Sequence, residues 1–203
     1  MQQSLLQETN NILPFNGEVL FFPNVFSKLE SDNYLSALTA GINWKHEAIK
    51  MFGKEVMQPR LTAWYGDSDK PYSYSGITMQ PHAWNAHLLE IKTRIEGTSG
   101  TIFTSALLNY YRDGKDSMGW HRDNEKELGI NPVIGSVSFG AARTFQLRNY
   151  ADKSIIRGIE LTHGSFLIMR GQTQHYWEHR VPKATLRNVA TGPRINITFR
   201  VIE

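Results

Sequence analysis

The segment His121-Arg122-Asp123 places an imidazole and a carboxylate two residues apart. In extended chain, alternate side chains point to the same face, so both could reach one metal ion. A third ligand from a distant strand would complete a set of two histidines and one carboxylate. Such a set leaves open positions on the metal and suits non-haem iron(II) oxygenases. By itself, however, a short H-x-D motif is a weak signal.

Three later histidines are candidates for the third ligand. His163 lies in THG before a predicted strand and is expected in a turn. His175 and His179 are four residues apart, so both could face one metal if the chain were helical there. Tyr176, Trp177 and the Val-Pro that follows instead favour extended chain. The spacing alone therefore leaves His175 and His179 nearly equal.

The segment RINITFRV, residues 194–201, alternates like a strand with two different faces. The apolar face carries Ile195, Ile197, Phe199 and Val201, and the polar face carries Arg194, Asn196, Thr198 and Arg200. If the polar face lines the inside of a barrel, its two arginines need anionic partners, and a dicarboxylate would supply two. The alternative is that this face lies in solvent.

From residue 101 onward the chain consists of short β-branched and aromatic segments bounded by turn residues. The predicted strands are TIFTSALLNYY (101–111), PVIGSVSFG (132–140), RTFQLRN (143–149), SFLIMR (165–170) and RINITFRVI (194–202). Many short strands without helices between them predict an antiparallel sandwich or jelly roll. The mouth of such a barrel is a natural place for a metal and small-molecule site.

Two helices are expected before these strands and would pack outside the barrel. The first starts at Ser31 in SDNYLSALTAGI, with Ser31 or Asp32 as its N-cap and Gly41 at its end. The second has Pro81 in its first turn and Gly97 as its stop. Its apolar residues recur at helical spacing and are Trp84, Leu88, Ile91 and Ile95.

The composition fits one compact domain of 203 residues without cysteine, so any metal must be held by His and carboxylate. We expect a loose arm over 1–15, a helical and hairpin nucleotide-recognition portion over 16–100, and a catalytic core over 101–203. Residues 1–100 hold 8 Lys/Arg and 10 Asp/Glu, whereas residues 101–203 hold 14 Lys/Arg and 9 Asp/Glu. The basic second half of the chain is compatible with a phosphate-bearing partner. No apolar run approaches a membrane span, and no secretory signal is evident, so a cytoplasmic location is expected.

Four segments in order resemble the AlkB family of iron(II)- and 2-oxoglutarate-dependent dioxygenases. They are LLNYYRDGKDSMGWHRDNE (107–125), SVSFGAARTFQLR (136–148), HGSFLIMRGQTQHYWEHRVP (163–182) and RINITFR (194–200). The resemblance covers most of residues 58–200 and includes the family's R-x-N-x-T-F-R ending. It implies a mainly β fold with flanking helices, a double-stranded β-helix with an N-terminal helical and hairpin extension. It also selects His179, so that His121, Asp123 and His179 would bind iron(II).

The resemblance further implies a site for the cosubstrate 2-oxoglutarate. Arg194 and Arg200 would each pair one of its carboxylates. Asn109 and Tyr111, which share a face of the first core strand, would hydrogen-bond it.

A pocket for a nucleic-acid base is implied beside this site. Glu125 would accept hydrogen bonds from the exocyclic amine of the base, and Tyr72 or Tyr74 would stack on it. KMFGK (50–54) resembles the hairpin of the duplex-active branch, with Phe52 as a finger that fills the place of the flipped base, and Arg60 is also in register. Without the resemblance, two tyrosines at this spacing are more often ordinary strand aromatics, and a buried hairpin phenylalanine is as reasonable as a finger.

The implied activity is oxidative dealkylation of 1-methyladenine- or 3-methylcytosine-type bases in DNA by a monomer, with release of formaldehyde, succinate and CO2. The alternatives are the same chemistry on methylated RNA or a protein side chain, and a catalytically silent barrel that binds nucleic acid. Relative to the duplex-active branch, the loop at 149–158 is short and the basic cluster thins to KATLR (183–187). The preference between single- and double-stranded DNA therefore stays open.

Overall fold

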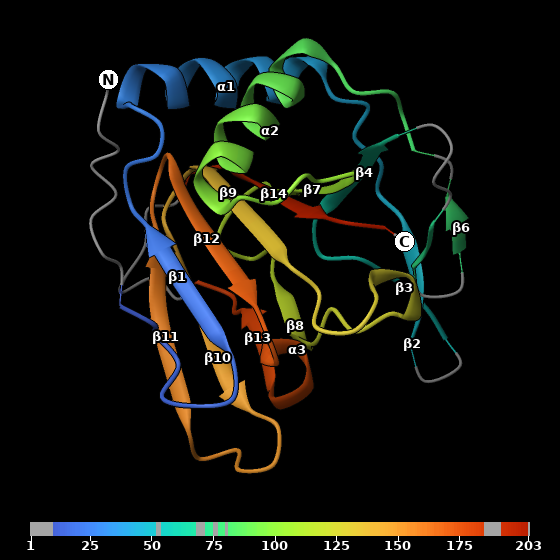
Figure 1. The fold of residues 1–203 in the computed structure, drawn as a ribbon. Coiled ribbons are helices and arrows are strands. Elements are labelled where there is room, and N and C mark those ends of the chain that lie inside the picture. The colour runs from blue at the N-terminus through green and yellow to red at the C-terminus, as the bar shows by residue number, and fades with distance from the viewer. Residues whose placement is uncertain are drawn as a thin grey trace, which may run out of the picture.

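The computed structural model of the protein describes residues 10–51, 54–67, 72–74, 77–79, 81–184 and 192–202. Two antiparallel β-sheets face one another, and two helices cover the outer face of the larger sheet (Figure 1). The apolar core forms one layer beneath the helices and a second layer between the sheets. This arrangement confirms the prediction of a mainly β fold with flanking helices.

The larger sheet has the order β1-β12-β9-β14-β7-β4, and the smaller sheet has the order β11-β10-β13-β8. The strands of the larger sheet are β1 (Glu18–Phe22), β4 (Leu61–Gly66), β7 (Ser105–Tyr111), β9 (Ile134–Gly140), β12 (Ser165–Arg170) and β14 (Arg194–Arg200). Those of the smaller sheet are β8 (Met118–His121), β10 (Arg143–Asn149), β11 (Ile156–Leu161) and β13 (Trp177–Val181). Two hairpins are formed by β2 (Ala48–Met51) with β3 (Lys54–Met57) and by β5 (Tyr72–Tyr74) with β6 (Ile77–Met79).

The helices are α1 (Lys28–Gly41), α2 (Ala86–Ser99) and the single turn α3 (Thr173–Tyr176), with a 3-10 turn at Lys126–Leu128. Helices α1 and α2 lie over the larger sheet, whereas α3 leads into β13 at the end of the smaller sheet (Figure 1). Among the described residues, no helix is both long and apolar enough to cross a membrane.

Strand β14 lies inside the larger sheet, where it pairs with β9 on one side and β7 on the other. Its apolar face packs beneath the helices through Ile195, Ile197 and Phe199, which are fully buried. Arg194 and Arg200 lie on the opposite face, line the space between the sheets, and are each 1% exposed. The interior location of this polar face is therefore confirmed, and the solvent-exposed alternative is wrong.

The larger sheet draws strands from both halves of the chain. Strands β10 and β12 have the bounds that their residue patterns predict, but local patterns do not predict β1 and β4. These two strands lie at the edges of the sheet, where β1 pairs with β12 and β4 pairs with β7. Because their pairing partners are distant in sequence, their strand conformation depends on tertiary context. The sheet consequently runs across the division expected between residues 100 and 101.

Helix α1 begins earlier than its sequence predicts. Ser27 is the N-cap, and it forms a capping box in which the Ser27 Oγ accepts from the Glu30 N–H while the Glu30 carboxylate accepts from the Ser27 N–H. Ser31 lies inside the helix and is fully buried, so the predicted start at Ser31 or Asp32 is wrong. Ser27 caps the helix instead because the box that it forms with Glu30 satisfies two helix-terminal N–H groups. The predicted end at Gly41 is confirmed.

Helix α2 is displaced from its predicted bounds, although its core-facing residues Leu88, Ile91 and Ile95 are buried as expected. Asn85 caps its N-terminus through a bond from the Leu88 N–H to Asn85 Oδ1, so Pro81 precedes the helix. At the other end, Gly97 lies inside the helix, and Gly100 ends it in the left-handed conformation with φ of 69°. The predicted start at Pro81 and stop at Gly97 are therefore wrong.

The two glycines of α2 provide a matched test of these bounds, because an added Cβ would meet no atom within 4 Å at either position. Gly97→Ala should raise the free energy of unfolding by about 0.5–1 kcal/mol, since alanine is favoured inside a helix. Gly100→Ala should lower it by about 1–2 kcal/mol, because the left-handed conformation strains a residue with a Cβ. Urea unfolding of both variants checks the signs. Stabilisation at 100 with destabilisation at 97 would place the helix end at Gly97.

Candidate metal and cosubstrate site

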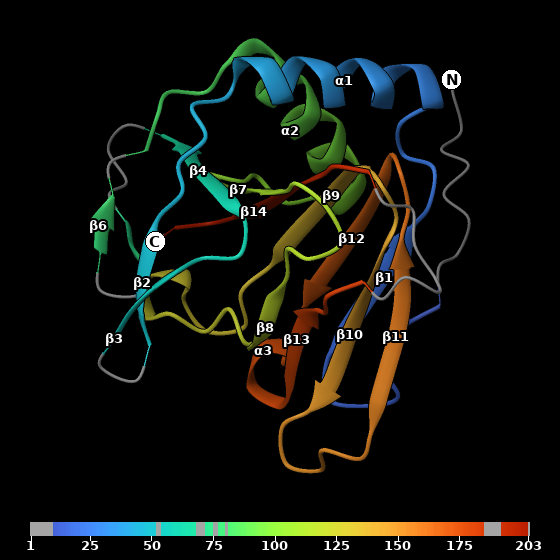
Figure 2. The same cartoon turned by 180° about the vertical axis from the view of Figure 1, so that it is seen from behind.

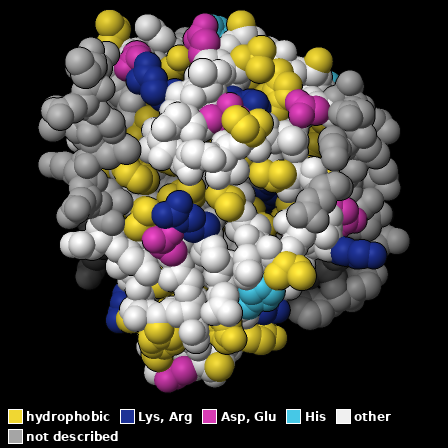
Figure 3. Space-filling view, viewed as in Figure 1, with side chains coloured by type: hydrophobic (Ala, Val, Ile, Leu, Met, Phe, Trp, Pro, Cys, Tyr) yellow, Lys and Arg dark blue, Asp and Glu magenta, His cyan; other side chains and the backbone are white. Residues whose placement is uncertain are grey.

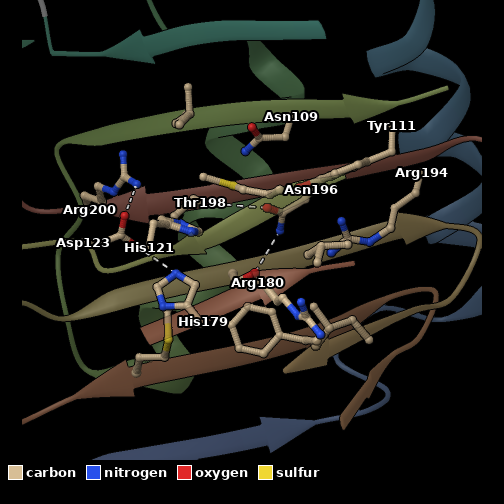
Figure 4. A pocket seen from close by; sticks show the side chains of 17 residues that line it. Asn109, Tyr111, His121, Asp123, His179, Arg180, Arg194, Asn196, Thr198 and Arg200 are labelled. Carbon is tan, nitrogen blue, oxygen red and sulfur yellow. Dashed lines mark hydrogen bonds and ion pairs between the residues drawn. The ribbon is translucent and has the colours of Figure 1, made fainter. Parts of the chain in front are cut away.

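Strand pairing in the smaller sheet brings the separated parts of the predicted metal site together. Antiparallel pairing of β8 with β13 places His121 directly opposite His179, with ring centroids 4.2 Å apart. Asp123 follows β8, and its Oδ2 lies 3.7 Å from His179 Nε2. The ligand atoms of the three residues lie within 4.8 Å of one another, so together they could hold a metal ion (Figure 4).

Both histidines have the protonation state that metal binding requires. The pKa of His179 is lowered to about 3 by burial and by the neighbouring His121. Burial also lowers the pKa of His121, although Asp123 acts in the opposite direction. The His121 Nδ1–H donates to the Gly119 carbonyl at 2.9 Å, which leaves the lone pair on Nε2. Both rings are therefore neutral at physiological pH.

Asp123 is ionised although it is 1% exposed. Burial raises the pKa of its carboxyl, but the Arg200 guanidinium and the two histidines outweigh this effect and hold the pKa at about 2. Arg200 Nη2 donates to Asp123 Oδ1 at 2.6 Å. One carboxylate oxygen is thus held by β14, while the other faces His179.

The backbone of Asp123 is fixed by Gln174, a residue that sequence reasoning missed. Gln174 lies in α3 and is 1% exposed, and its Oε1 accepts a hydrogen bond from the Asp123 N–H at 2.9 Å. Its Nε2 lies 3.6 Å from Met169 Sδ. Because α3 leads directly into the strand that carries His179, Gln174 connects the two metal-binding segments. The two bonded residues are 51 positions apart, so no local pattern could reveal the contact.

The three candidate ligands lie at one end of a cavity between the sheets. Figure 4 shows Arg194 and Tyr111 toward the other end, with Asn109 between them and the candidate ligands. The remaining polar lining comes from Ser136, Arg180, Asn196 and Thr198, to which sequence reasoning assigned no role. The alternation of β14 nevertheless placed Asn196 and Thr198 on the inner face.

Arg194 contributes an incompletely paired positive charge to this cavity. Its Nη2 donates to Ser138 Oγ at 3.0 Å, while its Nε and Nη1 have no hydrogen-bond partner among the described residues. Its Cζ lies 5.0 Å from the centroid of the Tyr111 ring. Burial lowers the pKa of Arg194 to about 10, so the guanidinium stays charged at neutral pH. A buried guanidinium with unused donors fits a carboxylate ligand.

Asn109 and Tyr111 face the cavity from β7, as their spacing predicts. Asn109 Oδ1 accepts a hydrogen bond from Arg60 Nε at 2.6 Å, and both residues are buried. The described contact of Arg60 is therefore with the wall of the cavity. Its role toward a nucleic acid stays a prediction.

The residues predicted to contact a base are described only in part. Glu125 precedes the 3-10 turn, and its Oε2 is buried without a hydrogen-bond partner among the described residues. Tyr72 and Tyr74 belong to β5, but their side chains lie outside the described part of the chain, as does Phe52 altogether. Their roles stay predictions.

The other candidate histidines lie away from the three clustered ligands. His163 lies in the turn before β12, as predicted, and its Nδ1 accepts from the Gly140 N–H at 2.8 Å. His175 is exposed and lies in α3, so the extended chain expected around it is wrong up to Tyr176 and correct from Trp177 onward. Hydrogen bonds from the N–H groups of His175 and Tyr176 to the Gln172 carbonyl close this single turn.

The two facing sheets, the cavity between them and the three clustered ligands indicate the class of protein to which this chain belongs. Residues 18–200 match the 2OG-Fe(II) oxygenase superfamily, and the chain belongs to this family. It is 42% identical over 193 residues to alpha-ketoglutarate-dependent dioxygenase alkB homolog 3 of Homo sapiens, which covers 91% of this chain and 66% of that protein. It is 36% identical over 189 residues to DNA oxidative demethylase ALKBH2 of Homo sapiens, covering 88% of this chain and 71% of that protein.

The fold is also similar to a solved structure, that of OsALKBH1. The TM-score is 0.62 at 16% sequence identity, and the match covers 90% of this chain and 97% of that one. This likeness, with the family match, confirms the predicted jelly-roll fold. The chain spans slightly less than two thirds of the length of the alkB homolog 3 protein.

The residues present fit iron(II) and 2-oxoglutarate, the metal and cosubstrate of this family. His121, Asp123 and His179 offer two nitrogens and one oxygen and leave positions for other ligands. The unused donors of Arg194 offer a place for a carboxylate in the same cavity.

Gln174→Met should weaken the binding of Mn²⁺ roughly tenfold, because the buried Asp123 N–H loses its acceptor and the carboxylate is less well fixed. Equilibrium dialysis with Mn²⁺ measures this affinity without requiring turnover. Gln172→Met is the matched control, since Gln172 is exposed and its side chain makes no capping bond. An unchanged Mn²⁺ affinity in Gln174→Met, or an equal loss in Gln172→Met, would contradict the positioning role.

Proposed function

We propose that the protein oxidatively removes alkyl groups from DNA bases, using iron(II), dioxygen and 2-oxoglutarate. The observation that carries the proposal is the set of half-buried His121 and buried Asp123 and His179 in a cavity that also holds the charged, incompletely paired Arg194. A 2-oxoglutarate oxygenase requires a metal site beside a group that binds a dicarboxylate. DNA is supported by the relative named DNA oxidative demethylase ALKBH2.

In the proposed reaction, one oxygen atom of dioxygen enters the N-alkyl carbon. The other enters 2-oxoglutarate, which is converted to succinate and CO2. A hydroxylated N-methyl group then leaves as formaldehyde, and the base keeps its nitrogen without the alkyl group. Bound iron(II) supplies the activation of dioxygen for this oxidation.

The protein's own contribution is orientation and exclusion of water. Arg200 holds Asp123 in its ionised form, and Gln174 fixes the backbone of that residue. Arg194 would pair the carboxylate of 2-oxoglutarate that lies away from the metal. The apolar lining of the cavity, which includes Leu107 and Phe145, keeps bulk water from the reacting atoms.

Glu125 is the proposed acceptor for the target base. Its buried and unpartnered Oε2 would be satisfied by the exocyclic amine of adenine or cytosine. Its position two residues after Asp123 brings it near the proposed metal ligands. The proposal also includes stacking of Tyr72 or Tyr74 on the base, insertion of Phe52 in the place of the flipped base, and a contact of Arg60 with the nucleic acid. A monomeric state and a location in the cytoplasm, at the nucleoid or in the nucleus are also parts of it.

Mass spectrometry of oligonucleotides that contain 1-methyladenine or 3-methylcytosine tests the function. With iron(II), ascorbate and 2-oxoglutarate, we expect loss of the methyl group from DNA and release of formaldehyde. Asp123→Ala and His179→Ala should abolish the loss, because each removes a metal ligand. Single- and double-stranded forms are compared in parallel. Loss from RNA alone would favour the RNA alternative, and no loss from either would contradict the proposal.

Replacing the two buried arginines should separate cosubstrate binding from metal binding. Arg194→Met should raise the KM for 2-oxoglutarate by about tenfold or more, since a charged hydrogen bond is lost. Its Mn²⁺ affinity should be unchanged, because no hydrogen bond or ion pair joins Arg194 to the metal ligands among the described residues. Arg200→Met should weaken both, since Arg200 also holds Asp123. Equal effects of the two variants on Mn²⁺ affinity would contradict this division.

A further inference from the structure

We propose that the outer face of the smaller sheet binds the phosphate backbone of a nucleic-acid strand. The binding surface, here called the outer basic face, consists of Trp120, Arg122, Arg148, Tyr150, Lys153 and Arg180. The kind of partner rests on the proposed function, but the residues lie on the side of the sheet away from the candidate metal ligands.

Strand alternation separates the two faces. On β8, His121 points into the cavity, so Trp120 and Arg122 on either side of it lie on the outer face. On β13, Arg180 is next to the inward His179 and itself borders the cavity (Figure 4), while its guanidinium stacks on Trp120 of the outer face. Figure 2 shows the smaller sheet from this side. Because β8 is the edge strand, the outer basic face reaches the edge of the sheet that carries His121.

Trp120 is the centre of one half of the outer basic face. The Cζ atoms of Arg148 and Arg180 lie 4.1 and 4.4 Å from its ring centroid. Stacking on an aromatic ring holds a guanidinium plane in position while its N–H edge stays available. Arg180 Nε donates to Gln146 Oε1 at 2.7 Å, and its other N–H groups have no hydrogen-bond partner among the described residues.

Tyr150 is the centre of the other half, and it is 50% exposed. Arg122 Cζ lies 4.0 Å and Lys153 Nζ lies 4.2 Å from its ring centroid. Arg122 Nη1 donates to the His175 carbonyl at 3.1 Å, which fixes the side chain at one end only. These cations are therefore pre-positioned, with donors left for a further acceptor.

The charge on this face is unbalanced. In the described part of the chain, Glu178 is the one carboxylate that pairs with its four cations, and it contacts Arg148 and Lys153. On the opposite face, Lys and Arg lie next to Asp and Glu (Figure 3). Elsewhere in the described part of the chain, Lys28, Arg94 and Arg170 each form an ion pair with a carboxylate, that of Asp32, Glu30 and Glu18 respectively. Arg122 and Arg180 thus have no carboxylate partner among the described residues.

A nucleic-acid strand is the partner that best fits this chemistry. Phosphates are bound by guanidinium and ammonium groups, which this face presents in two clusters.

Fluorescence anisotropy with single-stranded oligothymidylate measures this surface alone, since that probe carries no N-alkyl group and no exocyclic amine. Arg180→Gln and Lys153→Gln should each weaken binding about threefold or more and reduce the slope of log affinity against log salt by about 0.7. Lys28→Gln is the matched control, because it removes the same charge from the exposed end of α1, where the side chain is 84% exposed. It should leave the affinity and the salt slope unchanged.

Unchanged salt slopes in both Arg180→Gln and Lys153→Gln would overturn the proposal. An equal loss in Lys28→Gln would also overturn it, because net charge rather than this face would then govern binding. Binding of the wild-type chain to anionic phospholipid vesicles but not to oligothymidylate would assign the face to a membrane surface instead. Failure of the proposed function is distinguishable, since it would leave oligothymidylate binding intact while methylated oligonucleotides kept their methyl groups.

Discussion

The ion pair between Asp123 and Arg200 joins the two sheets at their buried interior. Asp123 follows a strand of the smaller sheet and Arg200 ends the central β14 of the larger one. Each charge is almost completely removed from water, so either one alone would cost several kcal/mol. The pair therefore constrains the separation of the sheets as well as the charge of the proposed metal ligand. The placement of His121 and His179 relative to Asp123 depends on this constraint.

Arg194 differs from the Asp123–Arg200 pair, because its buried charge has no opposite charge beside it among the described residues. Its guanidinium is held between Ser138 and the Tyr111 ring without a carboxylate partner among the described residues. Such a group lowers the stability of the empty protein, and a dicarboxylate that pairs with it recovers that loss. Polar interiors of this kind depart from the rule that buried charges are compensated, and such departures concentrate at functional sites.

The smaller sheet has a different chemistry on each side. Its inner face presents neutral imidazoles to the cavity, whereas its outer face carries cations stacked on Trp120 and Tyr150. Adjacent residues of one strand thus serve both sides, with His121 inward and Arg122 outward. Helix α3 supports this arrangement, because Gln174 binds the backbone of Asp123 and Arg122 binds the carbonyl of His175. In the proposed function, a strand of nucleic acid on the outer side would lie close to the candidate metal ligands on the inner side.

Short-range patterns in the sequence determined the parts of this protein that carry their own signal. The alternation of β14 predicted which face is polar, and the H-x-D spacing predicted that His121 and Asp123 share a side, because a strand repeats every two residues. The Ser27 cap of α1 also belongs to this local kind, because Ser27 and Glu30 form a capping box only three residues apart. Only tertiary structure brought β1 and β4 into the sheet and Gln174 to Asp123. These outcomes depend on contacts between residues distant in sequence, which a local pattern does not contain.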